Sequence, residues 1–357
     1  MTLEPHELEA LRPFWYPVLP LEQLGSEPLS LDLLGQRLVL WRLAGDGSGS
    51  DVSVAVAEDR CCHRSARLSG GWVTDGGCLV CPYHGWEFEA DGRCRRVPQD
   101  PDRPVSPRFR IRAHRAQLRY GYVWVCLAPE AQQAIPEFPE ASDPGVRLIH
   151  GFFETWRCSP FRVIENGLDN YHHYFVHRGL LQATTPIPEP LRDGIEPTAD
   201  GFRFSLPLEV ANNGSLSATL DDHSHQLTVE RRVSWIAPLG LSLELGWPNG
   251  LRQRIVLFAV PQDGRDSRIV RFYFRNDDEE QVPEASVTRF ERGLIDQDRR
   301  ILEGIDGAYG AAPIHETLIE ADQPIALMRQ RLRQLLSGPA VDPAAGTSTA
   351  PDPAPSH

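Results

Sequence analysis

The chain has 357 residues, which is long enough for two domains. It is 41% hydrophobic and 24% charged, a composition typical of soluble globular proteins. Its net charge of −13 argues against nucleic-acid binding, which needs a basic face to neutralise phosphates. The sequence contains no lysine, so chemistry that requires one, such as pyridoxal phosphate attachment or a P-loop, is excluded.

Nothing in the sequence predicts a membrane span or a domain for nicotinamide or flavin. No apolar run approaches the roughly eighteen residues of a spanning helix, and the stretch from Met1 to Leu11 is acidic. We therefore expect no signal peptide and a cytoplasmic location. No Gly-x-Gly-x-x-Gly motif opens a helix after a strand, so electrons for a redox reaction are expected to come from a partner protein.

Residues 1–140 are predicted to form a small all-β domain after a short helix at 7–11. Short apolar runs between turn-forming residues predict strands at 38–41, 52–56 and 120–125. The segment 128–145 is rich in Pro, Ala and acidic residues and has no periodicity. The boundary between two domains is therefore placed in this segment.

Two pairs of cysteine and histidine lie between the second and third of these strands. Cys61-x-His63 is followed, after seventeen residues, by Cys81-x-x-His84. Two thiolates and two imidazoles suit either a tetrahedral zinc ion or a Rieske [2Fe-2S] cluster, in which two histidines replace two cysteines on one iron. Zinc fingers group like ligands together, whereas each pair here carries one of each kind. This mixed order favours the two-iron cluster over zinc.

Two further features surround these ligands. Cys62 is expected to pack as a small buried residue, with a disulfide to Cys78 as the alternative, and it is not assigned as a ligand. From Ser53 to Val125, twelve arginines outnumber eight acidic residues. This local positive charge indicates either an ordinary solvated surface or a docking face for an acidic electron donor.

The second part of the chain alternates apolar and polar residues, which predicts an antiparallel sheet with one covered face. The expected strands are 202–210, 226–235, 241–247, 254–260 and 269–274. Two helices, at 286–305 and 319–336, follow the sheet, so the fold class is α+β with a second domain at 141–337. Residues 338–357 are rich in Pro, Ala, Ser, Thr and Gly and are predicted to be disordered.

The second domain opens with an aspartate and three histidines within nine residues: Asp169, His172, His173 and His177. Two histidines and a carboxylate form the facial triad that binds ferrous iron and leaves positions open for dioxygen and substrate. If this segment is helical, the spacing of four places His173 and His177 on one face. An exposed helix with incidental histidines is the alternative.

The third ligand is expected on the helix at 286–305, which offers Asp296 and Asp298. Asp298 lies four residues after Leu294 and four before Leu302, within the predicted apolar stripe. The residues predicted for this stripe are Val287, Phe290, Leu294, Ile301, Leu302 and Ile305. A carboxylate on a buried stripe is unfavourable unless it binds a cation, so Asp298 is preferred.

Both motifs resemble those of the Rieske non-haem iron oxygenases. The run from Cys61 to Arg64 with Cys81-Pro82-Tyr83-His84-Gly85-Trp86 is similar to the family's cluster motif, except that Cys62 stands where proline is usual. The iron motif Asn-x-x-Asp-x-x-His-x4-His is matched by Asn166, Asp169, His172 and His177. The resemblance, over roughly residues 12–336, implies a helix-grip catalytic domain in which His172, His177 and Asp298 bind one Fe(II). Some relatives use the shorter spacing that would select His173.

The resemblance also implies how electrons reach this iron. Asp169 would bridge His84 of one subunit and His172 of the next, which requires a ring, most often a homotrimer. Asn166 would contact or shield the iron, or make ordinary helix hydrogen bonds. The sequence of the motif most resembles that of the branch that contains vanillate and dicamba demethylases and pheophorbide oxygenase. The Cys-x-x-Cys and membrane anchor of the plant pheophorbide enzymes are absent.

We therefore expect an O2-dependent oxygenase. A ferredoxin or reductase reduces the cluster, and the iron site hydroxylates or oxidatively demethylates a hydrophobic, ring-containing substrate; both monooxygenation and dioxygenation stay open. The alternative is a Rieske electron carrier without oxygenase activity. A carrier would have no use for His172, His177 and Asp298, which makes the oxygenase the preferred hypothesis.

Overall fold

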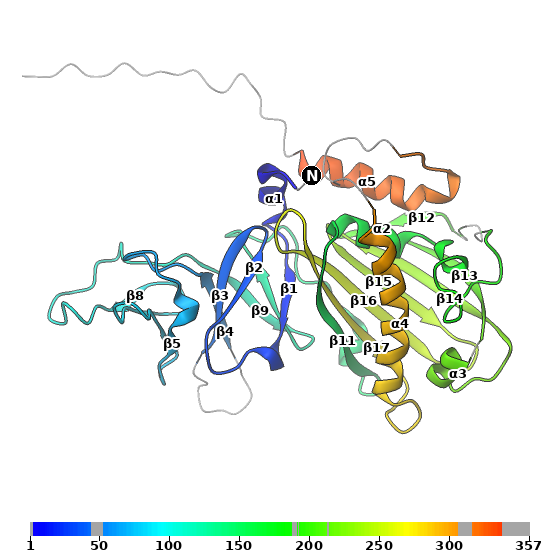
Figure 1. The fold of residues 1–357 in the computed structure, drawn as a ribbon, viewed down its shortest axis with the longest axis horizontal. Coiled ribbons are helices and arrows are strands. Elements are labelled where there is room, and N and C mark those ends of the chain that lie inside the picture. The colour runs from blue at the N-terminus through cyan, green and yellow to red at the C-terminus, as the bar shows by residue number, and fades with distance from the viewer. Residues whose placement is uncertain are drawn as a thin grey trace, which may run out of the picture.

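Three antiparallel sheets make up most of the structure (Figure 1). The computed structural model describes residues 3–43, 53–187, 191, 193–212, 214–305 and 316–337. The α+β class is confirmed: strands dominate, with a small number of helices, and no helix in these ranges is long and apolar enough to cross a membrane. The predicted tail at 338–357 lies outside the described residues.

The first part of the chain holds a six-stranded sheet and a smaller four-stranded one. The larger sheet has the order β1-β10-β9-β4-β3-β2, and the smaller has the order β5-β6-β7-β8. The larger sheet comprises β1 (Tyr16–Pro20), β2 (Leu29–Leu33), β3 (Gln36–Arg42), β4 (Val54–Glu58), β9 (Ala113–Arg119) and β10 (Tyr122–Cys126). The smaller comprises β5 (Trp72–Val73), β6 (Leu79–Val80), β7 (Glu87–Phe88) and β8 (Cys94–Arg96), all inserted between β4 and β9.

A seven-stranded sheet forms the second part, in the order β11-β17-β16-β15-β14-β13-β12. Its strands are β11 (Arg147–Trp156), β12 (Ile195–Pro197), β13 (Gly201–Ala211), β14 (Gln226–Ile236), β15 (Gly240–Gly246), β16 (Arg252–Pro261) and β17 (Ser267–Arg275). In β13 and β14 buried residues alternate with less buried ones, because one face is covered and the other meets solvent. Each of the five strands expected here is found, with ends shifted by one or two residues.

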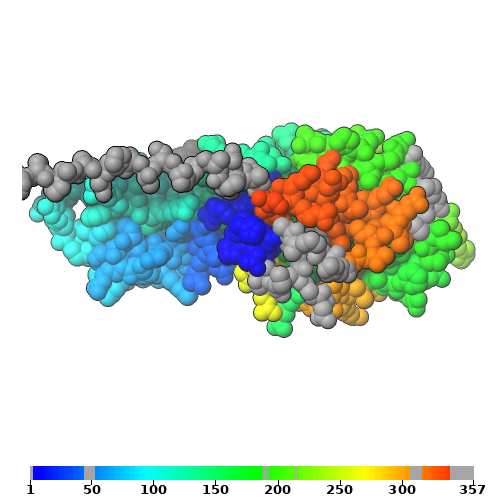
Figure 2. All heavy atoms as spheres, turned by 90° about the horizontal axis from the view of Figure 1, so that it is seen from above, coloured from blue at the N-terminus to red at the C-terminus, as the bar shows by residue number. Residues whose placement is uncertain are grey.

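The described residues form the helices α1 (Pro5–Leu11), α2 (Pro160–Leu168), α3 (Gly214–Leu220), α4 (Glu284–Leu302) and α5 (Gln323–Leu336). Of these, α2 and α4 pack against the large sheet, whereas α3 packs on α4 and α5 packs on α2. Short 3-10 turns occur at Leu21–Gln23, Leu68–Gly70, Pro139–Ser142, His172–Tyr174 and Glu320–Asp322. The long α4 crosses the sheet beside β11, and the N-terminal α1 lies against α5 (Figures 1 and 2).

One hydrophobic core joins the six-stranded and the seven-stranded sheet, and a separate core packs the small sheet against β3 and β4. The ring of Tyr122 on β10 lies 5.3 Å from that of Phe272 on β17, and Trp124 meets Phe258 edge-on at 5.0 Å. Backbone bonds tie the turn between β2 and β3 to the end of β16: Leu34 N–H donates to the Pro261 carbonyl at 2.9 Å. The small sheet nevertheless lies at one end of the molecule and α4 at the other (Figure 1). The exact division at residue 140 stays a prediction.

Candidate metal centres

The first candidate centre is built by two loops with the same backbone hydrogen bonds. In each loop the cysteine N–H donates to the carbonyl five residues on, at 2.8 Å for Cys61 and 2.9 Å for Cys81. Its carbonyl accepts from the N–H four residues on, at 2.9 and 3.0 Å respectively. That fourth residue has a positive φ in both loops, 60° at Ser65 and 69° at Gly85, which glycine adopts readily and serine seldom. The matched loops present their ligands as a symmetric pair.

The four predicted cluster ligands lie together at the tips of these loops. Cys61 and Cys81 are buried, and the rings of His63 and His84 are 4.6 Å apart. Trp86 stacks on His63 at the same distance with the planes nearly parallel, which fixes that imidazole. Burial, and then the neighbouring Cys81 thiol, raise the pKa of Cys61 to about 12, so the thiolate forms only with a cation beside it. Two adjacent buried thiols with two imidazoles fit the donor set of a Rieske cluster.

The expectation for Cys62 is wrong. Its side chain is exposed and Cys78 is buried, and both are free thiols rather than a disulfide. Cys61, the neighbouring residue of the same loop, is buried and Cys62 is not. Cys78 lies instead within 3.7 Å of the Arg95 guanidinium.

The second candidate centre begins where α2 ends. The helix stops at Leu168, Asp169 has extended backbone angles, and His172–Tyr174 form a single 3-10 turn. The segment is therefore not an α-helix, and the spacing of four that favoured His173 with His177 loses its basis. All three imidazoles come together instead, with ligand nitrogens within 4.8 Å of one another.

Asp298 on α4 faces two of these histidines. Its Oδ1 lies 3.7 Å from His172 Nε2 and 3.4 Å from His177 Nε2. The same oxygen is buried and has no hydrogen-bond partner in the described part of the chain. A buried carboxylate oxygen without a partner is costly, and two imidazoles with one carboxylate are the donors that ferrous iron takes. The residues present therefore fit a mononuclear iron.

Neighbouring side chains orient both of these imidazoles. Asp169 Oδ1 accepts from the Tyr171 N–H at 2.9 Å, and its Oδ2 lies 3.7 Å from His172 Nδ1. Burial raises the pKa of Asp169, but the nearby His172 imidazole and two backbone N–H groups outweigh this effect, so the pKa lies below its ordinary value. Gln297 Oε1 lies 3.0 Å from His177 Nδ1. Each imidazole thus has its Nδ1 toward protein and its Nε2 toward Asp298.

The choice between the two aspartates of α4 agrees with their burial, but the predicted stripe does not hold throughout. The side chain of Asp298 is 10% exposed, whereas that of Asp296 is 43% exposed. Ile301 and Ile305 were expected on the buried stripe and are 53% and 40% exposed. Ile305 lies beyond the last residue of the helix at Leu302, and the buried face continues through Ile295 instead of Ile301.

Comparisons with known proteins identify both regions. Residues 14–110 match the Rieske [2Fe-2S] domain, and residues 156–338 match the vanillate O-demethylase oxygenase C-terminal domain. The chain belongs to the Rieske oxygenases. It is 30% identical over 311 residues to methylxanthine N3-demethylase NdmB of Pseudomonas putida, which covers 82% of this chain and 81% of that relative.

Solved structures agree with this assignment. NdmA of Pseudomonas putida CBB5 with caffeine superposes with a TM-score of 0.77 at 26% identity, covering 93% of each chain. Dicamba monooxygenase bound to 3,6-dichlorosalicylic acid reaches the same TM-score of 0.77 at 20% identity, over 91% of this chain and 97% of that one, a likeness of fold. The predicted family, enzyme class and two cofactors are confirmed, and the electron-carrier alternative is not favoured. The assignment of individual ligands stays a prediction.

A cavity in this Rieske oxygenase opens beside the second centre. All three histidines, Asp298 and Asn166 line it. The rest of its wall is mainly apolar and comes from the inner face of the large sheet and from α4, for example Leu208, Val229, Leu243, Trp247, Phe290 and Leu294. A mostly apolar pocket with few polar groups is typical of sites for small organic molecules.

Sequence reasoning missed several polar groups of this site, among them Gln297 beside His177, and Arg231 and Glu291 in the cavity wall. Arg231 occupies an inward position of β14 between Val229 and Val233. An arginine at an inward position of an alternating strand is a signal that the sequence already contained. Glu291 lies on the buried face of α4, seven residues before Asp298, and could have been found by the same periodicity.

Proposed function

We propose that this Rieske oxygenase is a monooxygenase that hydroxylates an organic molecule held in the cavity, and that demethylates it when the oxidised carbon is an O- or N-methyl group. The observation that carries the proposal is Asp298 Oδ1, buried without a hydrogen-bond partner among the described residues and facing two Nε2 atoms beside an apolar cavity. Relatives named as demethylases and the matched catalytic domain support this outcome.

In this proposal Cys61, His63, Cys81 and His84 hold the cluster, and His172, His177 and Asp298 hold the iron. When bound, the iron supplies dioxygen activation and the cluster supplies electrons one at a time. His172 is preferred over His173 because its Nε2 faces Asp298 while its Nδ1 faces Asp169. Burial, His172 and Arg231 lower the pKa of His173 well below its ordinary value, which keeps this buried imidazole neutral beside the site.

The protein residues orient the substrate and exclude water. The apolar wall holds the substrate body next to the histidines and limits bulk water, which protects the reacting carbon from side reactions. Asn166, from the last turn of α2, adds a polar group at the cavity edge. In the overall reaction one oxygen atom enters a C–H bond and the other leaves as water, which consumes two electrons and two protons. A hydroxylated methyl group then leaves as formaldehyde.

The electrons come from an external ferredoxin or reductase, and we propose a homotrimer in which they cross between subunits. Asp169 would bridge His84 of one subunit and His172 of its neighbour. Two features support this: the small sheet with the cluster loops lies at the opposite end of the molecule from α4, and Asp169 already faces His172 (Figure 1).

The first test is the iron content with electron paramagnetic resonance of the anaerobically reduced protein. We expect about three irons per wild-type chain, two in a Rieske cluster and one in the mononuclear site, and about two in Asp298→Ala with the Rieske signal unchanged. Asp296→Ala on the exposed face of the same helix is the matched control and should keep all three. A fully loaded wild type with a Rieske signal and only two irons would overturn the proposal in favour of an electron carrier.

A further inference from the structure

The guanidinium of Arg231 in the cavity wall has no carboxylate partner among the described residues, whereas the neighbouring Arg271 pairs with Glu291. Arg231 is 4% exposed and points inward from β14 between Val229 and Val233. Its Nη1 is buried and makes no hydrogen bond within the described residues. The side chain lines the same cavity as His172, His173, His177 and Asp298.

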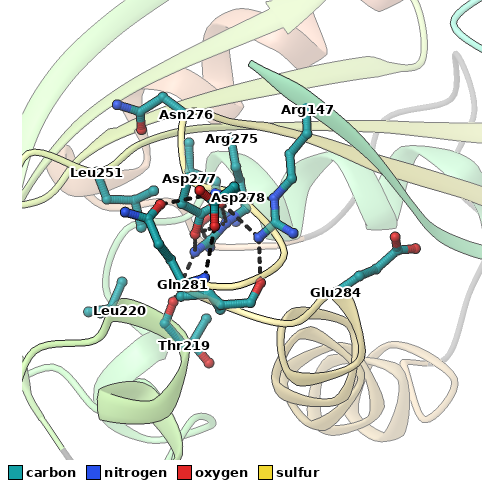
Figure 3. A network of polar contacts seen from close by, with 12 residues as sticks. Arg147, Thr219, Leu220, Leu251, Arg275, Asn276, Asp277, Asp278, Gln281 and Glu284 are labelled. Carbon is teal, nitrogen blue, oxygen red and sulfur yellow. Dashed lines mark hydrogen bonds and ion pairs between the residues drawn. The ribbon is translucent and has the colours of Figure 1, made fainter. Parts of the chain in front are cut away.

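Arg271 and Glu291, the other oppositely charged groups of this wall, pair with each other, although the Arg271 Nε has no hydrogen-bond partner among the described residues. Arg271 donates to Glu291, whose second oxygen accepts from Gln253 at 3.2 Å. Gln253 in turn accepts from Arg275 at 2.9 Å. The network continues from Arg275 to Asp277, whose carboxylate accepts hydrogen bonds from Arg275 and Arg147 (Figure 3). Arg147 Nη2 lies 2.8 Å from Asp277 Oδ1. This continuous network leaves no free carboxylate for Arg231.

The remaining acids near Arg231 are also engaged. Asp298 faces the histidines, and Asp169 accepts from the backbone N–H groups of Tyr171 and His172. Asp169 acts on Arg231 only through its field, and no hydrogen bond or ion pair joins the two in the described structure. Burial lowers the pKa of Arg231 to about 10, so the guanidinium is still charged at neutral pH.

A buried charge without a hydrogen-bonded partner is among the most costly features a fold can carry. Proteins keep such groups where a ligand supplies the missing partner. We propose that Arg231 binds a carboxylate of the substrate, so that the substrate class is a small apolar molecule with one carboxylate. The inference rests on the proposed oxygenase function and adds the specificity-determining residue of its cavity.

The surroundings of Arg231 set the orientation of this ligand. The fork of a guanidinium matches the two oxygens of a carboxylate, which gives direction as well as affinity. Arg231 lines the same cavity as His172 and His173, so the acidic end of the ligand would lie on the side of the proposed iron site. The aliphatic and aromatic wall from Leu208 to Phe290 receives the apolar body. A neutral molecule such as the caffeine bound by the similar NdmA would leave Arg231 unpaired.

The test is equilibrium binding to the anaerobic, iron-loaded full-length enzyme, where no turnover occurs. The probes are benzoate, 4-methoxybenzoate and 3-phenylpropionate, each compared with its neutral amide, and caffeine as a further neutral molecule. We expect at least one carboxylate to bind about 10- to 100-fold more tightly than its amide. This is the usual gain in affinity from a hydrogen-bonded pair of opposite charges. In Arg231→Gln this preference should disappear, and amide binding should change less than about threefold.

Three variants separate a binding role from a structural one. Arg231→Lys keeps the charge without the fork and should retain part of the preference. Arg232→Gln removes an adjacent arginine whose side chain is 50% exposed and should leave the preference intact. Thermal unfolding of Arg231→Gln should match or exceed that of the wild type, because an uncompensated buried charge is removed.

Equal binding of acids and amides by the wild type, a preference that survives in Arg231→Gln, or a preference lost equally in Arg232→Gln would each overturn the inference. Absence of binding by every carboxylate would overturn it too. A loss of thermal stability in Arg231→Gln with equal loss of both ligand types would assign Arg231 a structural role instead. The iron content distinguishes this failure from failure of the proposed function. A protein with three irons per chain and no preference for carboxylates would overturn only the inference about Arg231.

Discussion

At the scale of single residues, Gln297 contacts His177, one of the proposed iron ligands, at the ring nitrogen that faces away from Asp298. Its Oε1 lies 3.0 Å from His177 Nδ1, and its Nε2 reaches the Arg178 carbonyl at 3.4 Å. An amide acceptor at Nδ1 selects the tautomer in which Nε2 carries a free lone pair. Burial lowers the pKa of His177 against the opposing charge of Asp298, which also favours the neutral ring.

We therefore predict that Gln297→Leu weakens iron binding about 10- to 100-fold, the usual effect of removing a partner behind a metal-binding histidine. Competition with a chelator for the mononuclear iron measures the change, and the Rieske signal serves as an internal reference. Asp296→Asn, one position earlier on the exposed face, is the control. An unchanged iron affinity in Gln297→Leu would mean that Gln297 does not position His177.

The sequence predicted some of these residues and missed others for identifiable reasons. Asp298 could be separated from Asp296 because α-helical periodicity holds across the middle of α4. The same periodicity could not rank His172 against His173, because their segment leaves the α-helix at Leu168. A hydrogen bond such as that of Gln297 depends on where two distant segments meet, which no local pattern records.

At the scale of elements, the loop that carries the histidines is anchored by α5. The Tyr171 hydroxyl donates to Asp322 at the start of α5, and Arg329 of the same helix donates to Glu165 of α2. Glu316 joins this group, accepting from Arg162 and from Arg329 Nη2 at 2.7 Å. Four charged side chains of alternating sign thus fasten α5 to α2. The loop that carries the histidines is thus held by α2 and α5.

This network makes stability depend on pH through Glu316. Hydrogen bonds from Arg162 and Arg329 lower its pKa from 4.5 to about 2. Because the pKa of Glu316 is lower in the folded than in the unfolded protein, its ionised carboxylate stabilises the fold fully above the unfolded pKa of about 4.5. This stabilisation is lost as the pH falls from about 4.5 toward 2. Its side chain is 35% exposed, so after screening we expect Glu316→Gln to cost about 1–2 kcal/mol at pH 7.

Urea unfolding of the apo protein at pH 7 and pH 3.5 measures the effect. The difference between wild type and Glu316→Gln should shrink at the lower pH, and Glu320→Gln at a neighbouring exposed position should show little difference at either. A gap between the variants that stays constant across this range would contradict the assignment of Glu316 to the network.

Strands were predicted more accurately than loops for a physical reason. The alternation in β13 and β14 reflects burial on one face, and their register follows from it over eleven residues each. The cluster loops could be found because their ligands are chemically distinctive. Their matched backbone bonds and the exposure of Cys62 depend on turn geometry, which ligand spacing alone does not specify.

At the scale of the whole molecule, the two centres lie in opposite parts of one chain. The cluster loops belong to the small sheet at one end, and the second centre lies between α4 and the large sheet (Figure 1). The continuous core between the two parts, as in the contact of Tyr122 with Phe272, opposes a hinge that would bring the centres together. This arrangement supports the proposal that electrons cross to a neighbouring chain of a ring.

Mixed assembly tests this arrangement directly. His63→Ala removes the cluster and Asp298→Ala removes the iron, so each variant alone should be inactive. If electrons cross between subunits, co-expression in equal amounts should restore about a quarter of wild-type activity, because half of the chains carry a cluster and half of their neighbours carry iron. If electrons stay within one chain, the mixture stays inactive. Size-exclusion chromatography of each variant, with the wild type as reference, confirms that both assemble before the rates are compared.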